Sequence, residues 1–275
     1  MAEAVADRLG TEVVSTDAMQ VYRGLPLLTN QPERPTRLVA IWPLSHEASV
    51  GEYEQLAHAT IDELIATRES AVVAGGTGLY LRAALADIAL PPAVDPATRA
   101  RWEAEYDRDR NAAHAELRTR DPAAAAAVHV NDRRRVVRAL ELTDAGASLA
   151  PESDRLWSAA TRHPTIIVGL DVLADELERR IVARTAAMFE AGVIAEVCAA
   201  VAQPLSRTAE MALGLREIAS LAPGEAQERV AVRTRQYAAY QRKWMRRIPG
   251  LVGVNACRPV DEVADEILEM ACARQ

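Results

Sequence analysis

Cysteine, lysine and long apolar runs are all scarce in this chain of 275 residues. The cysteines, at positions 198, 257 and 272, are scattered and show no spacing typical of a zinc site, so they suit a reducing cytoplasm. No apolar run approaches the roughly 18 residues that cross a bilayer. The N-terminal MAEAVADRLG lacks the basic and apolar regions of a signal peptide. We therefore expect a cytoplasmic protein with no membrane partner.

Lysine is nearly absent, since Lys243 is the only one in the chain. A phosphate-binding P-loop has the pattern G-x-x-x-x-G-K-[ST], and Lys243 lies in a predicted helix with no glycines before it. The sequence therefore excludes a P-loop within these residues. Positive charge is carried by arginine, which binds phosphate in a bidentate manner but is also what a GC-rich genome supplies. The net charge of −7 argues against a generally basic nucleic-acid-binding protein.

Short apolar runs alternate with helical patterns through most of the chain, which is typical of a parallel α/β sheet. We expect strands over residues 13–14, 38–42, 71–74, 165–170 and 251–254. We expect helices over residues 1–9, 49–66, 79–85, 173–201 (with a break near Gly192), 209–221, 225–247 and 260–273.

The stretch from residue 95 to residue 149 is rich in alanine and arginine and has no strand signal. We expect it to form helices over residues 99–107, 112–118, 122–128 and 134–142, followed by a polar linker over residues 151–163. The sequence thus predicts an α/β core in two parts, residues 1–94 and 164–275, around an all-helical insertion at residues 95–163.

Two polar turns follow predicted strands. Asp17 lies in the first, within EVVSTDAMQVYRG at residues 12–24, and ligands of open α/β sheets bind just beyond the carboxyl ends of strands. The alternative is that Asp17 merely caps the next turn. The second is GGTG at residues 75–78, where glycines permit close backbone approach and a helix N-terminus favours an anion. Thr77 adds a hydroxyl at the same edge, although a purely structural turn is the alternative.

Arginine is concentrated in two further stretches. NDRRRVVR at residues 131–138 places Arg134 and Arg138 on one helical face with Arg135 beside them. This fits a phosphate-binding surface, or a solvated face paired with local acids. TRQYAAYQRKWMRR at residues 234–247 alternates basic groups with aromatic rings, which suits stacking on unpaired RNA bases. The alternative there is a core aromatic stripe flanked by solvated arginines.

Arg180 and Arg184 lie one turn apart on the helix that follows the strand at residues 165–170. They would reach the same sheet edge as Asp17, or form a surface pair with Glu176 or Glu190. The histidines show no ligand spacing, so we assign none of them to a metal site or to a catalytic base.

Taken together, these motifs resemble those of the tRNA dimethylallyltransferases, the tRNA isopentenyl transferase family. The matching pieces follow the family's order over about the whole chain: STDAMQVYRG at residues 15–24, GGTGLYL at 75–81, DP at 121–122, ND at 131–132, RVVRALEL at 135–142, residues 180–197, GLR at 214–216, TRQY at 234–237, Gln241 and Trp244. Each piece alone is weak evidence, but the ordered set is highly specific.

The resemblance implies a P-loop-NTPase-like parallel sheet core, typical of ATP- and nucleotide-binding proteins, with a helical insertion that grips the anticodon arm of tRNA. It implies transfer of a dimethylallyl group from dimethylallyl diphosphate to the exocyclic amine of the adenine next to the anticodon, with Mg²⁺ on the diphosphate. Asp17 matches the family's general base. Thr77 and Arg184 match the catalytic groups that hold the diphosphate and stabilise the leaving charge.

The residues that match the family's tRNA-contacting segments are Asp17, Ala18, Met19, Gln20, Arg134, Arg135, Val136, Val137, Arg138, Met211, Ala212, Leu213, Gly214, Leu215, Arg216, Ala239, Tyr240, Gln241, Arg242, Lys243, Trp244, Met245 and Arg246. We expect the protein to act as a monomer.

The family begins with a strand and a P-loop, G-P-T-x-x-G-K-[ST], which cradles the diphosphate, and this chain contains neither. The family's G-T-A-K-P has only a loose counterpart, without the lysine, in TNQP at residues 29–32. We expect the reading frame to continue upstream for about 15–30 codons that encode an apolar strand and a P-loop. The rival hypotheses are a non-enzymatic tRNA-binding remnant and a small-molecule P-loop kinase.

Overall fold

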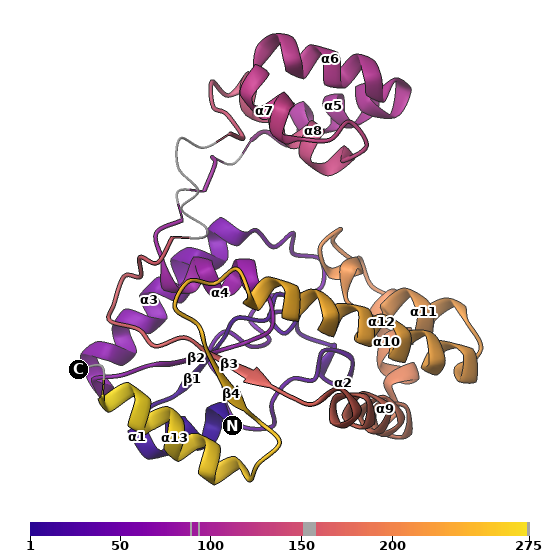
Figure 1. The fold of residues 1–275 in the computed structure, drawn as a ribbon. Coiled ribbons are helices and arrows are strands. Elements are labelled where there is room, and N and C mark those ends of the chain that lie inside the picture. The colour runs from indigo at the N-terminus through magenta and orange to yellow at the C-terminus, as the bar shows by residue number, and fades with distance from the viewer. Residues whose placement is uncertain (89, 93, 151–157, 274–275) are drawn as a thin grey trace. The chain divides into compact units, whose positions relative to one another are not determined.

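The computed structural model describes residues 1–88, 90–92, 94–150 and 158–273. These residues form two compact units (Figure 1). Unit 1 combines Met1–Asp87 with Leu156–Gln275, and unit 2 is Ile88–Arg155. The chain therefore leaves unit 1 once, forms unit 2 and then returns to complete unit 1.

The first half of unit 1 is built from a pair of parallel strands and the helices around them. In chain order its elements are α1 (Ala2–Leu9), β1 (Val13–Ser15), α2 (Pro26–Thr29), α3 (Val50–Arg68), β2 (Val72–Ala74) and α4 (Gly78–Leu85). β1 pairs with β2 in parallel, with Val13 opposite Val72. The side chain of Ser49 accepts a hydrogen bond from the backbone N–H of Glu52, which starts α3 at the expected place.

The strand predicted over residues 38–42 is wrong. Among the described residues the only pairing here is by isolated bridges, one between Arg37, just before the segment, and Val14, and one between Trp42, its last residue, and Tyr22. Leu38 and Ala40 have φ angles of 64° and 53°, in the left-handed region, and two such residues interrupt an extended run. The apolar composition of the segment reflects partial burial beside β1, and it does not specify an extended backbone.

The second half of unit 1 resumes with a strand and continues mainly as helix. Its elements are β3 (Val168–Asp171), α9 (Ala174–Glu190), α10 (Val193–Val201), the 3-10 helix η2 (Ala209–Met211), α11 (Leu215–Ser220), α12 (Pro223–Met245), β4 (Val252–Asn255) and α13 (Val260–Cys272). The predicted break near Gly192, which has a φ of 96°, is confirmed. Gly214, with a φ of 95°, divides the helix predicted over residues 209–221 into η2 and α11.

The strands that the structure describes form two separate parallel pairs, β1–β2 and β3–β4. The parallel α/β class is thus confirmed, but the single continuous sheet that the sequence pattern suggests is not what these residues form. One reason lies at β1, whose edge away from β2 is already used. The backbone of Arg37 accepts from Ser15 N at 3.0 Å and donates to Val13 O at 2.8 Å.

Unit 2 consists of helices wherever the structure assigns regular elements to it: α5 (Pro96–Arg108), α6 (Arg110–Arg120), α7 (Pro122–Ala127) and α8 (Arg133–Asp144). Each begins at an aspartate whose side chain accepts a backbone N–H of the first turn: Asp95, Asp109, Asp121 and Asp132. Leu117, Val136 and Leu140 are fully buried in its core. These helices lie where the sequence predicts helices.

Unit 2 begins and ends earlier in the chain than the insertion predicted over residues 95–163. The difference arises because the end of that range packs on unit 1. The buried side chain of Arg82 donates to the carbonyl oxygens of Ser158 at 2.9 Å and Ala160 at 3.3 Å. Arg162 pairs with Asp62 at 2.9 Å. Residues 151–157, part of the predicted linker, lie outside the described residues.

Candidate active site

The turn after β1 places Asp17 at the carboxyl end of the strand, and hydrogen bonds hold its side chain there. Asp17 Oδ1 accepts from the backbone N–H of Met19 at 2.8 Å and of Gln20 at 3.4 Å. Among the residues described, Oδ2 has no hydrogen-bond partner. One carboxylate oxygen therefore caps the turn, and the other is left for a proton or a ligand.

Burial raises the pKa of the Asp17 carboxyl above its usual value, although the two backbone N–H groups and the charge of Arg184 act in the opposite direction. A carboxylate with a raised pKa is a stronger base than an ordinary aspartate. Arg184, on α9, is exposed to solvent. The protein around it nevertheless lowers its guanidinium pKa, which the Asp17 carboxylate partly offsets. The two groups are therefore electrostatically coupled.

The GGTG turn lies directly against the Asp17 turn. Thr77 Oγ1 accepts a hydrogen bond from the backbone N–H of Ala18 at 3.3 Å. A Cβ atom added to Gly75 would lie 2.3 Å from Thr16 Oγ1, so only glycine permits this approach. Residues 75, 76 and 78 all lack a positive φ, which means that close packing and not left-handed backbone requires glycine here.

One face of α12 holds the same turn from the other side. Gln241 Nε2 donates to Gly76 O at 3.0 Å, and the hydroxyl of Tyr237 donates to the same oxygen at 3.3 Å. Tyr237 OH also lies 3.4 Å from Thr77 Oγ1. The indole of Trp244 packs so closely that a Cβ on Gly78 would lie 2.0 Å from its ring atoms. Sequence reasoning missed Tyr237 as a site residue, although its i, i+4, i+7 spacing with the other two was visible.

The segment after Asp17 is held by a second group of polar contacts. Gln20 Nε2 donates to Asn30 O at 2.8 Å, and Gln31 Nε2 donates back to Gln20 O at 3.2 Å. Glu196, on α10, accepts the backbone N–H groups of residues 27 and 28 at 2.9 and 2.8 Å. Glu196 therefore caps α2 and fixes the loop that supports Gln20. The sequence offered no specific signal for this role.

The predicted tRNA-contacting stretches of unit 1 are partly exposed and partly buried. Met211 is 63% exposed and Arg216 is exposed, whereas Ala212 and Leu215 are buried. The exposed members are Ala239, Tyr240 and Lys243 on α12 and Arg246 at its C-cap. The partly buried members are Gln241, Arg242, Trp244 and Met245. The helix thus offers one side to solvent and uses the other against the GGTG turn and β3.

The predicted stretch on α8 of unit 2 divides in the same way. Arg134 and Arg135 are exposed, and Arg135 has one ion pair, to Asp132 at 3.6 Å. Arg138 is instead committed to unit 2, because it pairs with Glu141 at 3.1 Å and donates to the carbonyl of residue 92 at 2.8 Å. Val136 and Val137 have buried side chains in the core of unit 2. Of this stretch, Arg134 and Arg135 are the residues whose side chains are exposed to a partner.

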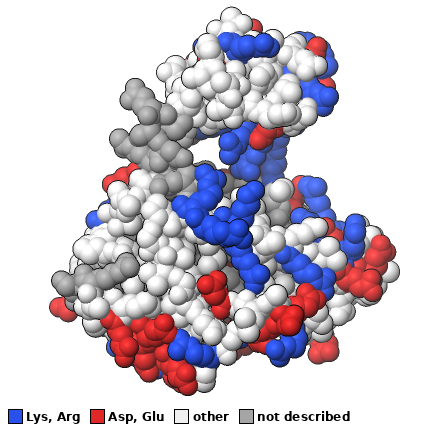
Figure 2. Space-filling model, viewed as in Figure 1, with Lys and Arg blue, Asp and Glu red and all other residues white. Residues whose placement is uncertain are grey.

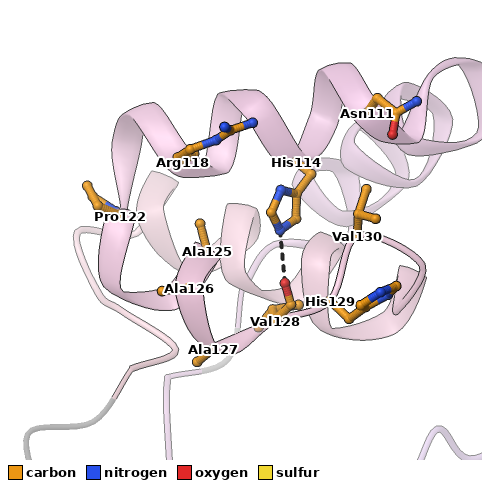
Figure 3. A pocket seen from close by; sticks show the side chains of 10 residues that line it. All are labelled: Asn111, His114, Arg118, Pro122, Ala125, Ala126, Ala127, Val128, His129 and Val130. Carbon is orange, nitrogen blue, oxygen red and sulfur yellow. Dashed lines mark hydrogen bonds between the residues drawn. The ribbon is translucent and has the colours of Figure 1, made fainter.

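A hollow of about 720 Å³ lies in unit 2, and none of its lining residues is one of those predicted for the site. Figure 3 shows the side chains around it, with His114 Nε2 at 2.9 Å from Val128 O. Alanine and valine side chains form much of its lining. The described residues contain no cluster of histidine, cysteine or carboxylate groups that would hold a metal ion without other ligands.

Charge is unevenly distributed over the visible surface. In Figure 2, Lys and Arg gather over the C-terminal part of α12, whereas Asp and Glu gather over α13 and α1. The contribution of α12 includes the exposed Lys243 and Arg246. An acidic chain therefore carries a local basic surface beside the Asp17 and GGTG turns. None of the helices described is both long enough and apolar enough to cross a membrane.

Comparison with known proteins identifies the family. The family model described as IPP transferase (IPPT) matches residues 20–248. The chain belongs to the IPP transferase family. A tRNA dimethylallyltransferase of Salinispora arenicola is 38% identical over 267 residues, which cover 92% of this chain and 77% of that protein.

Solved structures of IPP transferases show the same fold. A tRNA isopentenylpyrophosphate transferase from Bacillus halodurans has a TM-score of 0.67 at 28% identity, covering 99% of this chain and 91% of that chain. A eukaryotic dimethylallyltransferase acting on tRNA has a TM-score of 0.76 and covers 100% of this chain and 76% of that one. Its identity of 21% makes this second likeness one of fold alone.

Proposed function

We propose that this protein transfers a dimethylallyl group from dimethylallyl diphosphate to the exocyclic amine of the adenine next to the anticodon of tRNA. Family membership and the activity named for its relatives support an enzyme of this class. The observation that carries the proposal is the meeting of two turns: Ala18 N, next to Asp17, donates to Thr77 Oγ1 at 3.3 Å, while the charge of Arg184 acts on Asp17.

The chemistry assigned to these groups is a single displacement. The amine nitrogen forms a bond to the allylic carbon, the bond from that carbon to the diphosphate oxygen breaks, and pyrophosphate leaves with the electron pair. Asp17 accepts the proton that the amine loses, a task that its raised pKa favours. Thr77 and Arg184 hold the diphosphate, and the cation of Arg184 stabilises the charge that develops on it.

Mg²⁺ is part of the proposal as an ion carried by the diphosphate. Mg²⁺ in such sites keeps several waters and takes only one or two protein oxygens besides the phosphates. Because Asp17 Oδ2 is assigned to the amine proton, the ion would be held by the diphosphate oxygens and by its own waters, which fits a site with few protein oxygens to spare. When bound, the ion would neutralise part of the charge on the leaving pyrophosphate.

The tRNA would contact the exposed side of α12, Met211 and the exposed Arg134 and Arg135 of α8, with unit 2 acting as the insertion that grips the anticodon arm. The exposed Tyr240 suits stacking on an unpaired base, and Lys243, Arg246 and Arg134 suit phosphate contacts. We include in the proposal a P-loop-NTPase-like ancestry for the core, a cytoplasmic location and a monomeric state.

Incubation of the purified protein with tRNA and dimethylallyl diphosphate tests the proposal. Digestion of the tRNA should yield an adenosine heavier by one dimethylallyl group. The Asp17→Asn variant keeps the Oδ1 acceptor of the turn, so it should bind tRNA normally but transfer the group at least about 10²-fold more slowly, the scale of general base catalysis. An undiminished rate in that variant would remove Asp17 from the reaction.

A further inference from the structure

Three side chains on one face of α12 meet three successive residues of the GGTG turn. Gln241 contacts Gly76 O, Tyr237 contacts Gly76 O and Thr77 Oγ1, and Trp244 packs on Gly78. Gln241 already satisfies the Gly76 carbonyl at 3.0 Å. The Tyr237 hydroxyl is therefore not needed to avoid an unpaired carbonyl, and its contact with Thr77 becomes its distinctive feature.

The protons of this group can be assigned from the groups that only accept. The single proton of the Tyr237 hydroxyl can go to Gly76 O at 3.3 Å or to Thr77 Oγ1 at 3.4 Å. The phosphate oxygens of the donor only accept, so they require the proton of Thr77. With the donor bound, Thr77 Oγ1 accepts from Ala18 N and from Tyr237, since Gln241 already donates to Gly76 O. These two partners set the direction of the Thr77 proton.

We propose that Tyr237 is a positioning residue that orients the hydroxyl of Thr77 toward the diphosphate donor and, through Ala18, toward the turn that carries Asp17. This inference rests on the proposed function, because it assigns Thr77 to the donor. The chain of hydrogen bonds runs from α12 through Thr77 to the Asp17 turn, and so links three elements that are distant in sequence. Without the Tyr237 hydroxyl, Thr77 keeps its contact with Ala18 N but loses the second partner that directs its proton.

Burial of the Tyr237 hydroxyl raises its pKa above the usual tyrosine value, so the group stays protonated throughout the neutral range. The proposed role is therefore one of hydrogen bonding and not of proton transfer. Tyr237→Phe retains the packed ring and removes only the hydroxyl, which isolates this role.

Binding of inorganic pyrophosphate and of dimethylallyl diphosphate to the full chain, measured by calorimetry, tests the inference together with the KM for the donor. Tyr237→Phe should raise the Kd for pyrophosphate and for dimethylallyl diphosphate about 3- to 10-fold, the effect of one lost hydrogen bond, and should leave the Kd for tRNA unchanged. Tyr106→Phe is the matched control, because it also removes a tyrosine hydroxyl that donates to a backbone carbonyl, in unit 2, at 2.7 Å from Val130 O. It should leave donor binding unchanged.

A double-mutant cycle with Thr77→Val distinguishes positioning from general structure. If Tyr237 acts through Thr77, the double variant binds the donor as Thr77→Val alone does. The inference would be overturned if the fold-changes in donor Kd of the two single variants multiplied in the double variant. It would also be overturned if Tyr237→Phe left the donor Kd unchanged. If Tyr237→Phe fails to fold, Thr77→Ser decides: it should keep donor affinity within about twofold, and a loss as large as that of Thr77→Val would refute the role of the hydroxyl. If the wild-type protein bound neither pyrophosphate nor dimethylallyl diphosphate, the proposed function itself would be refuted.

Discussion

The contact between Gly78 and Trp244 makes a sharp prediction for the Gly78→Ala variant. Gly78 is the first residue of α4, where alanine is a better helix former than glycine by about 0.5–1 kcal/mol. Helix propensity alone therefore predicts that the substitution stabilises the protein. The added Cβ, however, would lie 2.0 Å from three carbon atoms of the Trp244 ring.

The steric cost exceeds the gain in propensity. Carbon atoms pack at about 3.5–4.0 Å, so the methyl group would overlap a rigid ring by roughly 1.5–2 Å. Either the indole leaves its position or α12 moves away from α4. Overpacking of this kind costs about 1–3 kcal/mol and occasionally more. Because the overlap involves three ring atoms, we expect Gly78→Ala to lower the free energy of unfolding by about 2 kcal/mol net.

Urea unfolding followed by circular dichroism measures this change, and Gly224→Ala is the matched control. Gly224 lies in the first turn of α12, a Cβ added there would meet nothing within 4 Å, and its φ is not positive. That substitution should be neutral or stabilise by up to about 1 kcal/mol. Displacement of α12 in Gly78→Ala should also weaken pyrophosphate binding, since Tyr237 moves with the helix. Equal stability of the two variants would refute the packing argument.

Three further outcomes follow from the site. Asp17 must be ionised to act as a base, and burial raises its pKa, so the decline of the transfer rate at acidic pH should begin at a higher pH than an ordinary aspartate would give. Arg184→Gln removes a cation that lowers the Asp17 pKa, so it should move this decline to still higher pH. A move to lower pH would contradict the assignment. Replacing Arg134 and Arg135 with alanine should weaken tRNA binding and reduce its dependence on salt, whereas an unchanged salt slope would show a purely solvated face. Glu196→Ala should lower the free energy of unfolding by about 1–2 kcal/mol in urea titrations, unless the carboxylate does not cap α2.

Local patterns predicted most helices of this protein well. The four aspartate caps of unit 2 and the break at Gly192 depend on residues close in sequence, so they are readable without a structure. The segment at residues 38–42 failed because a short apolar run indicates burial but does not specify φ. Its left-handed residues are imposed by the path that the chain takes beside β1.

Motif order in the sequence by itself determined the family and drew attention to Asp17, Thr77 and Arg184. It did so because the chemistry of a ligand site constrains residue type and spacing over short stretches. The three positions lie far apart in the chain, however, and spacing carries no information on whether one turn touches another.

Tertiary structure alone decided which polar groups are free to act. Arg134 and Arg138 are equivalent on a helical wheel, yet only packing shows that Arg138 is committed to Glu141 and to a backbone carbonyl of residue 92. The same holds for Gly75, where glycine is required by the approach of Thr16 and not by its own backbone angles. Long-range packing brings together atoms whose separation in sequence is large, and no local pattern encodes those distances.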